Sequence, residues 1–175
     1  MNERSDFTLP RELVDMARKV VEANRAAGLR VATAESCTGG LVAAALTEIP
    51  GSSEVLEASF VTYSNEAKQG LLGVSSDVLE TFGAVSIATA WAMAQRTLVK
   101  TGTDVAVAIT GIAGPGGGSE KKPVGTVVFA RARRGADPDE VVADLKEFGD
   151  LGRGGVRLQA ALCALELLMP GADGP

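Results

Sequence analysis

Apolar positions in the first part of the chain follow a helical period and then change to a short continuous run. One helix face is formed by residues that recur at i, i+3, i+4, i+7 and i+8: Leu13, Met16, Ala17, Val20 and Val21. Gly28 ends this pattern, since glycine commonly follows the last turn of a helix. The run Leu29–Thr33 predicts a short strand, and a helical pattern resumes over Gly40–Glu48.

The rest of the chain alternates between β-forming runs and helical patterns that begin at serines and end near glycines. Further helices are expected over Asn65–Leu72, from Ser76 to near Gly83, over Ile87–Lys100 and over Gly155–Met169. Further strands are expected toward the end of Val55–Tyr63 and over Asp104–Thr110, Val124–Ala132 and Val141–Phe148. This order predicts a single-domain layered α/β/α sandwich with a mixed sheet over residues 1–175, with loose tails at 1–6 and 171–175.

Composition limits the classes of function. Hydrophobic residues make up 46% of the chain, aromatic residues only 4%, and the net charge is −5. A negative surface with few aromatic side chains argues against nucleic acid or an anionic membrane as a partner. The N-terminus has no apolar signal-peptide core and no apolar run is long enough to span a membrane, so we expect a cytoplasmic protein. We interpret Arg131, Arg133 and Arg134 as solvated surface charge.

The sequence gives no support for a metal site, a disulfide framework or a common nucleotide-binding motif. The chain has no histidine, and its cysteines, Cys37 and Cys163, are far apart. The glycine-rich segment Gly111–Pro123 does not spell G-x-x-x-x-G-K-[ST], and no G-x-G-x-x-G follows the first strand. A loop of this length between two strands is more often functional than a linker.

Ser36 lies where the first predicted strand gives way to a helix. Backbone N–H groups and the positive end of a helix dipole favour an anion at such a junction. If Ser36 is a nucleophile, the absence of histidine excludes a Ser-His-Asp triad, and lysine is the obvious alternative base. An ordinary helix-capping serine is the other interpretation. Cys37 is a rival nucleophile, although a small buried hydrophobic residue is the interpretation that we prefer for it.

Three segments that each follow a predicted strand should meet at one edge of the sheet, where open α/β folds bind ligands. They are the Ser36 turn, the segment Tyr63–Lys68 and the loop from Thr110 to Gly118. Glycines of this loop can present backbone N–H groups to an anion, namely Gly111, Gly114, Gly116, Gly117 and Gly118.

Each candidate side chain also has a plain structural interpretation. Lys68 is a candidate base if burial lowers its pKa, and otherwise an exposed helix lysine. Tyr63 relays a proton or packs in the core, and Thr110 offers a hydroxyl or is simply a β-branched strand residue. Arg153 and Arg157 bind an anion at the last helix or are solvated surface charges.

Several segments together resemble the C-terminal domain of the CinA family, which includes stand-alone nicotinamide-nucleotide amidohydrolases (NMN deamidases). The matching segments are Thr33–Gly40, Phe60–Lys68, Gly83–Ser86, Thr110–Glu120, Lys122–Thr126 and Val156–Gln159. The resemblance covers nearly the whole chain, without the N-terminal domain of the larger CinA proteins. It implies hydrolysis of the carboxamide of nicotinamide mononucleotide (NMN) in pyridine-nucleotide salvage, with no metal or organic cofactor.

The resemblance also implies roles for individual residues. Ser36 would be the nucleophile, Lys68 its general base, and Tyr63 a residue that assists proton transfer or holds the lysine. The substrate-binding residues would be Thr38, Gly39, Thr110, Gly111, Gly114 and Arg153. Arg153 would bind a negative group, such as the phosphate.

One departure from the family pattern lies before the last helix. The family usually reads Gly-Asp-Arg there, whereas this chain reads Leu151-Gly152-Arg153, with Asp150 displaced upstream.

The alternative function is a catalytically silent nucleotide-binding module linked to competence or DNA damage. We expect a homodimer, as for many small α/β enzymes.

Overall fold

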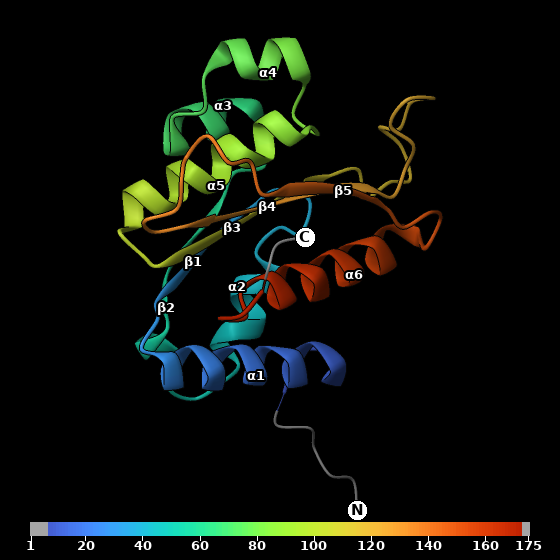
Figure 1. The fold of residues 1–175 in the computed structure, drawn as a ribbon. Helices are drawn as coiled ribbons and strands as arrows, with labels where there is room; N and C mark the ends of the chain where they lie inside the picture. The colour runs from blue at the N-terminus through green and yellow to red at the C-terminus, as the bar shows by residue number, and fades with distance from the viewer. Residues whose placement is uncertain (1–6, 173–175) are drawn as a thin grey trace, which may run out of the picture.

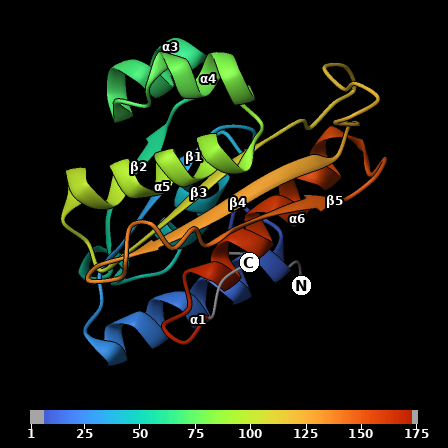
Figure 2. The same ribbon diagram turned by 45° about the horizontal axis from the view of Figure 1, so that its top comes forward.

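Within residues 7–172, the part of the chain that the computed structural model describes, five strands form one mixed sheet covered by helices on both faces (Figures 1 and 2). The strands are β1 (Val31–Glu35), β2 (Leu56–Val61), β3 (Val105–Gly111), β4 (Thr126–Arg133) and β5 (Ala143–Glu147). The helices are α1 (Arg11–Ala27), α2 (Leu41–Thr47), α3 (Asn65–Ala67), α4 (Ser76–Phe82), α5 (Ile87–Thr101) and α6 (Gly152–Leu167). Two short turns complete the chain, a 3-10 turn η1 (Ser52–Glu54) and a π-helical turn η2 (Lys68–Leu72). The predicted α/β class with a mixed sheet is therefore confirmed.

The strand order β2-β1-β3-β4-β5 places the parallel strands on one side of the sheet. β1 pairs in parallel with both β2 and β3, whereas β4 pairs antiparallel with β3 and with β5. Glu35, the last residue of β1, lies opposite Val61 and Ile109. The carboxyl ends of β1, β2 and β3 therefore share one edge, from which three chain segments emerge together.

Alternating side chains divide the core into two layers, as the period of two in a strand requires. In β3, Val107 and Ile109 join the layer built by α1, α2 and α6, whereas Ala108 packs under α5. Small residues on the second face include Ala34, Ala108, Ala130 and Ala132. No helix within residues 7–172 combines the length and the apolarity needed to cross a membrane.

Element boundaries differ from the sequence predictions in two places that matter for the site. β1 runs over Val31–Glu35 rather than Leu29–Thr33, because the Leu29 N–H still bonds back to the Asn24 carbonyl while parallel pairing continues to Glu35. The last helix begins at Gly152, so Arg153 lies in its first turn and not before it. Of the expected tails at 1–6 and 171–175, residues 1–6 and 173–175 fall outside the described residues, whereas the Ala172 N–H bonds to the Met169 carbonyl at 3.1 Å.

The interpretation of Arg131 as surface charge is wrong. Its side chain is only 3% exposed and donates from Nε to the Leu167 carbonyl at 2.7 Å and from Nη2 to the Met169 carbonyl at 3.3 Å. A guanidinium at the end of a helix satisfies carbonyl groups that have no partner in the helix and complements its dipole. Arg131 therefore fastens the end of α6 to β4.

Candidate active site

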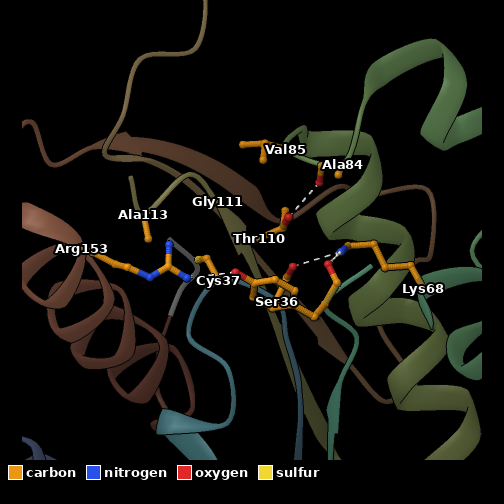
Figure 3. Close-up of a pocket in the computed structure, with 10 residues that line it drawn as sticks. Ser36, Cys37, Lys68, Ala84, Val85, Thr110, Gly111, Ala113 and Arg153 are labelled. Carbon is orange, nitrogen blue, oxygen red and sulfur yellow. Dashed lines mark hydrogen bonds between the residues drawn. The ribbon is translucent and has the colours of Figure 1, made fainter. Parts of the chain in front are cut away.

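A cavity of about 200 Å³ opens where the three parallel strands end. It is lined by Ser36, Cys37, Tyr63, Lys68, Ala84, Val85, Thr110, Gly111, Ala113 and Arg153. Figure 3 shows Lys68 entering from one side and Arg153 from the other, with Ser36 and Thr110 between them. The structure therefore brings together the three predicted segments and adds a fourth, Ala84–Val85, which the sequence analysis used only as part of a motif.

Lys68 is directed at the Ser36 hydroxyl. Its Nζ lies 3.0 Å from Ser36 Oγ (Figure 3). The Nζ also donates to the Thr62 carbonyl at 2.9 Å and to the Tyr63 carbonyl at 3.3 Å. A neutral amine has two N–H groups and one lone pair, so two carbonyls can take the donors while the lone pair accepts the serine proton. The lysine is held in the geometry of a base beside a nucleophile.

The surroundings of Lys68 favour its neutral form. The side chain is 1% exposed, so the interpretation as an exposed helix lysine is wrong. Burial lowers its pKa from the ordinary lysine range, although the nearby Cys37 thiol acts in the opposite direction. No carboxylate among residues 7–172 pairs with Lys68, so no counter-ion restores the charged state.

Local structure explains how Lys68 reaches the cavity. The Ser64 hydroxyl accepts from the Ala67 N–H at 3.0 Å and begins α3 directly after the β2 segment. The chain then widens into the π-helical turn η2, which starts at Lys68 itself. Such turns occur often at functional sites, because they redirect a side chain out of the regular helical register.

The Cys37 thiol does not have the properties of a nucleophile. It is 5% exposed, and burial raises its pKa to about 11. The Cys37 backbone N–H opposes this rise in pKa, Glu35 reinforces it, and Arg157 and Lys68 oppose it more weakly. A thiol with this pKa stays protonated near neutral pH, and only the thiolate attacks efficiently. The preferred interpretation of Cys37 as a small buried residue agrees with this environment.

Glu35 is a buried residue of the site that the sequence analysis missed. Its carboxylate is fully buried and accepts from the N–H groups of Gly40 at 3.0 Å, Val42 at 3.2 Å and Ala43 at 2.9 Å. The start of α2 is thus occupied by the protein's own anion. The sequence predicted that this helix terminus would receive an anion, and the structure shows that Glu35 supplies it.

The backbone N–H groups of residues 36–39 differ in whether a carbonyl already accepts from them, and this decides which could bind a negatively charged oxygen. The Gly39 N–H bonds to the Ser36 carbonyl at 3.0 Å, and the Ser36 N–H bonds to the Ile109 carbonyl at 2.9 Å. Among residues 7–172, no backbone carbonyl accepts from the N–H groups of Cys37 and Thr38, and the Cys37 N–H faces its own thiol. They follow the candidate nucleophile directly, where oxyanion donors are commonly found.

The end of β3 forms the wall between Lys68 and Arg153 (Figure 3). Thr110 donates from Oγ1 to the Ala84 carbonyl at 2.8 Å and so ties the segment before α5 to the strand. Gly111 has no room for a side chain, because an added Cβ would lie 2.9 Å from the Thr126 carbonyl oxygen and 2.8 Å from Val127 Cγ2. Both residues line the cavity, and the glycine lets β4 approach closely behind it.

Arg153 and Tyr63 meet at the rim of the cavity. Arg153 donates from Nη1 to the Gly114 carbonyl at 2.8 Å and from Nη2 to the Tyr63 hydroxyl at 3.0 Å. The Tyr63 side chain is 60% exposed, so it does not pack in the core, and it is the Tyr63 carbonyl that contacts Lys68. No carboxylate within residues 7–172 pairs with Arg153, whose position is fixed by a carbonyl and a phenol in place of the displaced Asp150.

Thr38 and Gly39 are not among the described residues that line the cavity. Thr38 is fully buried, and Gly39 adopts a φ of +62°, which favours glycine. Arg157 of α6 holds this turn from outside, and the surface-charge interpretation of Arg157 is therefore wrong. No group of three or more His, Cys, Asp or Glu residues in the described part of the chain is placed to hold a metal ion.

Comparisons with known proteins agree with this architecture. Residues 13–171 match the family model described as the CinA C-terminal domain. The structure of the competence/damage inducible protein CihA from Agrobacterium tumefaciens superposes with a TM-score of 0.88 at 48% identity, over 93% of this chain and 96% of that one. A competence-damaged protein (CinA) superfamily protein from Klebsiella pneumoniae gives a TM-score of 0.82 at 36% identity, over 89% of this chain and 94% of its own.

Curated relatives fall into two size classes. A protein named nicotinamide-nucleotide amidohydrolase PncC from Enterobacter agglomerans is 49% identical over 89% of this chain and 93% of its own length. A putative competence-damage inducible protein from Symbiobacterium thermophilum is 52% identical over 81% of this chain, but the chain spans only 34% of that protein. The chain likewise spans 35% of a CinA-like protein from Chlorobium luteolum.

Proposed function

Because the chain belongs to the CinA C-terminal domain family, we propose that it hydrolyses the carboxamide of NMN to nicotinic acid mononucleotide and ammonia. The observation that carries the proposal is the contact of 3.0 Å between Lys68 Nζ and Ser36 Oγ in a cavity at the edge of the sheet. The relative named nicotinamide-nucleotide amidohydrolase PncC supports the choice of substrate, since its name describes this activity.

The first half of the reaction transfers the acyl group to the enzyme. Neutral Lys68 removes the proton from the Ser36 hydroxyl as Oγ bonds to the carboxamide carbon, whose carbonyl oxygen becomes negatively charged. The resulting ammonium of Lys68 returns the proton to the amide nitrogen. The carbon–nitrogen bond then breaks, ammonia leaves, and an ester to Ser36 remains.

Water completes the reaction. Lys68, neutral again, takes a proton from a water molecule as the water oxygen attacks the ester carbon. The second tetrahedral intermediate then breaks its bond to Ser36 Oγ, and the Lys68 ammonium returns the proton to that oxygen. The carboxylate product leaves with the original serine restored. Ser36 and Lys68 thus perform both halves, and the N–H groups of Cys37 and Thr38 would donate to the oxyanion in each.

The cavity suits the reactive end of the substrate. Pockets that enclose a whole drug-sized ligand are usually about 300–1,000 Å³, whereas this cavity is about 200 Å³. The nicotinamide group would therefore enter, with Thr110 and Gly111 at its wall, and the ribose phosphate would remain at the rim. Arg153, with Gly114 and Tyr63 beside it, is the cation at that rim for the phosphate.

Replacement of Ser36 tests the proposal. Wild-type protein should release ammonia from NMN, and Ser36→Ala should reduce this rate by about 10⁴-fold or more while it keeps the wild-type circular-dichroism spectrum. Ser53→Ala, at an exposed serine in η1, is the matched control and should match the wild-type rate. Wild-type protein that binds NMN without release of ammonia would contradict the proposal and favour the regulatory module.

A further inference from the structure

Arg157 is a partly buried link between α6 and the turn that carries the candidate nucleophile. Its Nε donates to the Cys37 carbonyl at 3.2 Å and its Nη2 donates to the Thr38 carbonyl at 2.9 Å. The guanidinium therefore grips two consecutive carbonyls with its planar fork, a geometry that a lysine ammonium does not reproduce. Arg157 is not among the described residues that line the cavity, so it is placed to act through the turn.

A hydrogen bond to a backbone carbonyl also fixes the direction of the N–H group in the same peptide unit. Within residues 7–172 the only cis peptide bond is Gly114–Pro115, so the peptide from Cys37 to Thr38 is trans. In a trans peptide the C=O and the N–H point in opposite directions. The bond from Arg157 to the Cys37 carbonyl therefore sets the direction of the Thr38 N–H, just as the Gly39 bond to the Ser36 carbonyl sets that of the Cys37 N–H.

The N–H groups of Cys37 and Thr38 are the donors of this turn that no backbone carbonyl or carboxylate occupies. Glu35 takes the N–H groups of Gly40, Val42 and Ala43, so the start of α2 has no free donors there for substrate. An oxyanion donor must be aimed before the reaction begins, because a donor that has to reorient loses much of its benefit. The guanidinium charge at the carbonyl end of the peptide also polarises the N–H at the other end.

We propose that Arg157 is a positioning residue for the oxyanion site: its clamp on the Cys37 and Thr38 carbonyls holds the Thr38 amide in the orientation that the tetrahedral intermediate requires. This inference rests on the proposed hydrolysis of NMN. It separates the two arginines of α6, since Arg153 faces the cavity and would contact substrate, whereas Arg157 acts on the peptide behind the nucleophile.

Kinetics of Arg157→Lys and Arg157→Gln on NMN test the assignment. Both should lower kcat and kcat/KM by the same factor, about 100-fold, with KM unchanged, because the interaction is made only in the transition state. Arg153→Gln should instead raise KM for NMN. Arg96→Gln, at an exposed arginine of α5, is the control and should leave both constants at wild-type values. Added guanidinium ion should partly restore kcat in an Arg157→Ala variant, which a purely structural role would not produce.

The outcomes separate this inference from the proposed function. No ammonia from wild-type protein refutes the hydrolase itself, whatever the variants do. Active wild-type protein with Arg157→Lys at full kcat overturns the positioning role alone, as does a variant in which only KM changes. If Arg157→Gln does not fold, Arg157→Lys decides. If neither folds, Arg157 is a structural residue and the proposal is wrong.

Discussion

Lys68 and Glu35 both lie buried beside Ser36, yet their partners differ in kind. Glu35 receives three backbone N–H groups at the start of α2, so its negative charge is matched by donors that do not move. Lys68 contacts two carbonyls and the Ser36 hydroxyl, and no carboxylate pairs with it in the described part of the chain. Burial with full compensation serves the fold, whereas burial without a counter-ion leaves an amine ready to exchange a proton.

Substitution of Lys68 should have the largest effect and should separate activity from stability. Lys68→Met keeps the length of the side chain and removes the base, so the rate of ammonia release from NMN should fall by about 10⁴-fold. The free energy of unfolding should change little, because removal of a buried amine that has no counter-ion offsets the loss of its bonds to the Thr62 and Tyr63 carbonyls. Ammonia assays and urea unfolding measure the two effects.

Lys19→Met is the matched control for this variant, since Lys19 is exposed on α1. It should leave both rate and stability unchanged. A Lys68→Met protein that keeps more than about a tenth of the wild-type rate would exclude Lys68 as the base, because a general base contributes about 10²- to 10⁴-fold.

Substitution of Glu35 should lower the stability of the protein more, and its rate on NMN less, than substitution of Lys68. Glu35→Ala leaves three helix amides without their acceptor, so the free energy of unfolding in urea should fall by about 2–4 kcal/mol. The rate on NMN should fall less than in Lys68→Met, through the displaced turn. Glu80→Ala, at an exposed position of α4, should change stability little. Equal stability of Glu35→Ala and wild type would mean that the carboxylate does not hold α2.

Cys37 should give the smallest effect and sharpen the comparison, because it is a third ionisable group buried beside Ser36. Its pKa is raised to about 11, so the thiol is protonated under assay conditions. Cys37→Ala should keep the wild-type kcat on NMN and lose about 1 kcal/mol of stability, as expected for a small buried side chain. Loss of ammonia release in Cys37→Ala, with Ser36→Ala still active, would reassign the nucleophile.

Sequence patterns predicted most of the fold, because the apolar residues of its strands and helices recur at regular spacings and glycines follow the ends of several helices. The pairing of Ser36 with Lys68 was within reach because both follow strands that end at one edge, and a chain without histidine needs another base. The burial of Lys68 could not be predicted from the sequence, since it depends on the π-helical turn η2 and on how α5 packs against that turn.

Contacts that join distant segments could not be read from spacing. Glu35 caps a helix that begins several residues later, from the end of a strand, and no local capping rule describes that arrangement. Arg157 reaches a turn some 120 residues away in sequence. Tyr63 divides its groups, with its carbonyl at Lys68 and its hydroxyl at Arg153, and only the folded chain reveals which group serves which partner.

The most direct test of the contrast between these two buried ionisable groups is an NMR titration of the lysine side chains, with Lys68→Met to assign the Lys68 signal. The pKa of a lysine in water is about 10.4, and burial lowers the pKa of Lys68 from the ordinary lysine range. As pH rises, the Lys68 signal should therefore lose its proton before those of the exposed lysines. A Lys68 signal that titrates together with them would show a charged ammonium beside Ser36 and would contradict its role as the base.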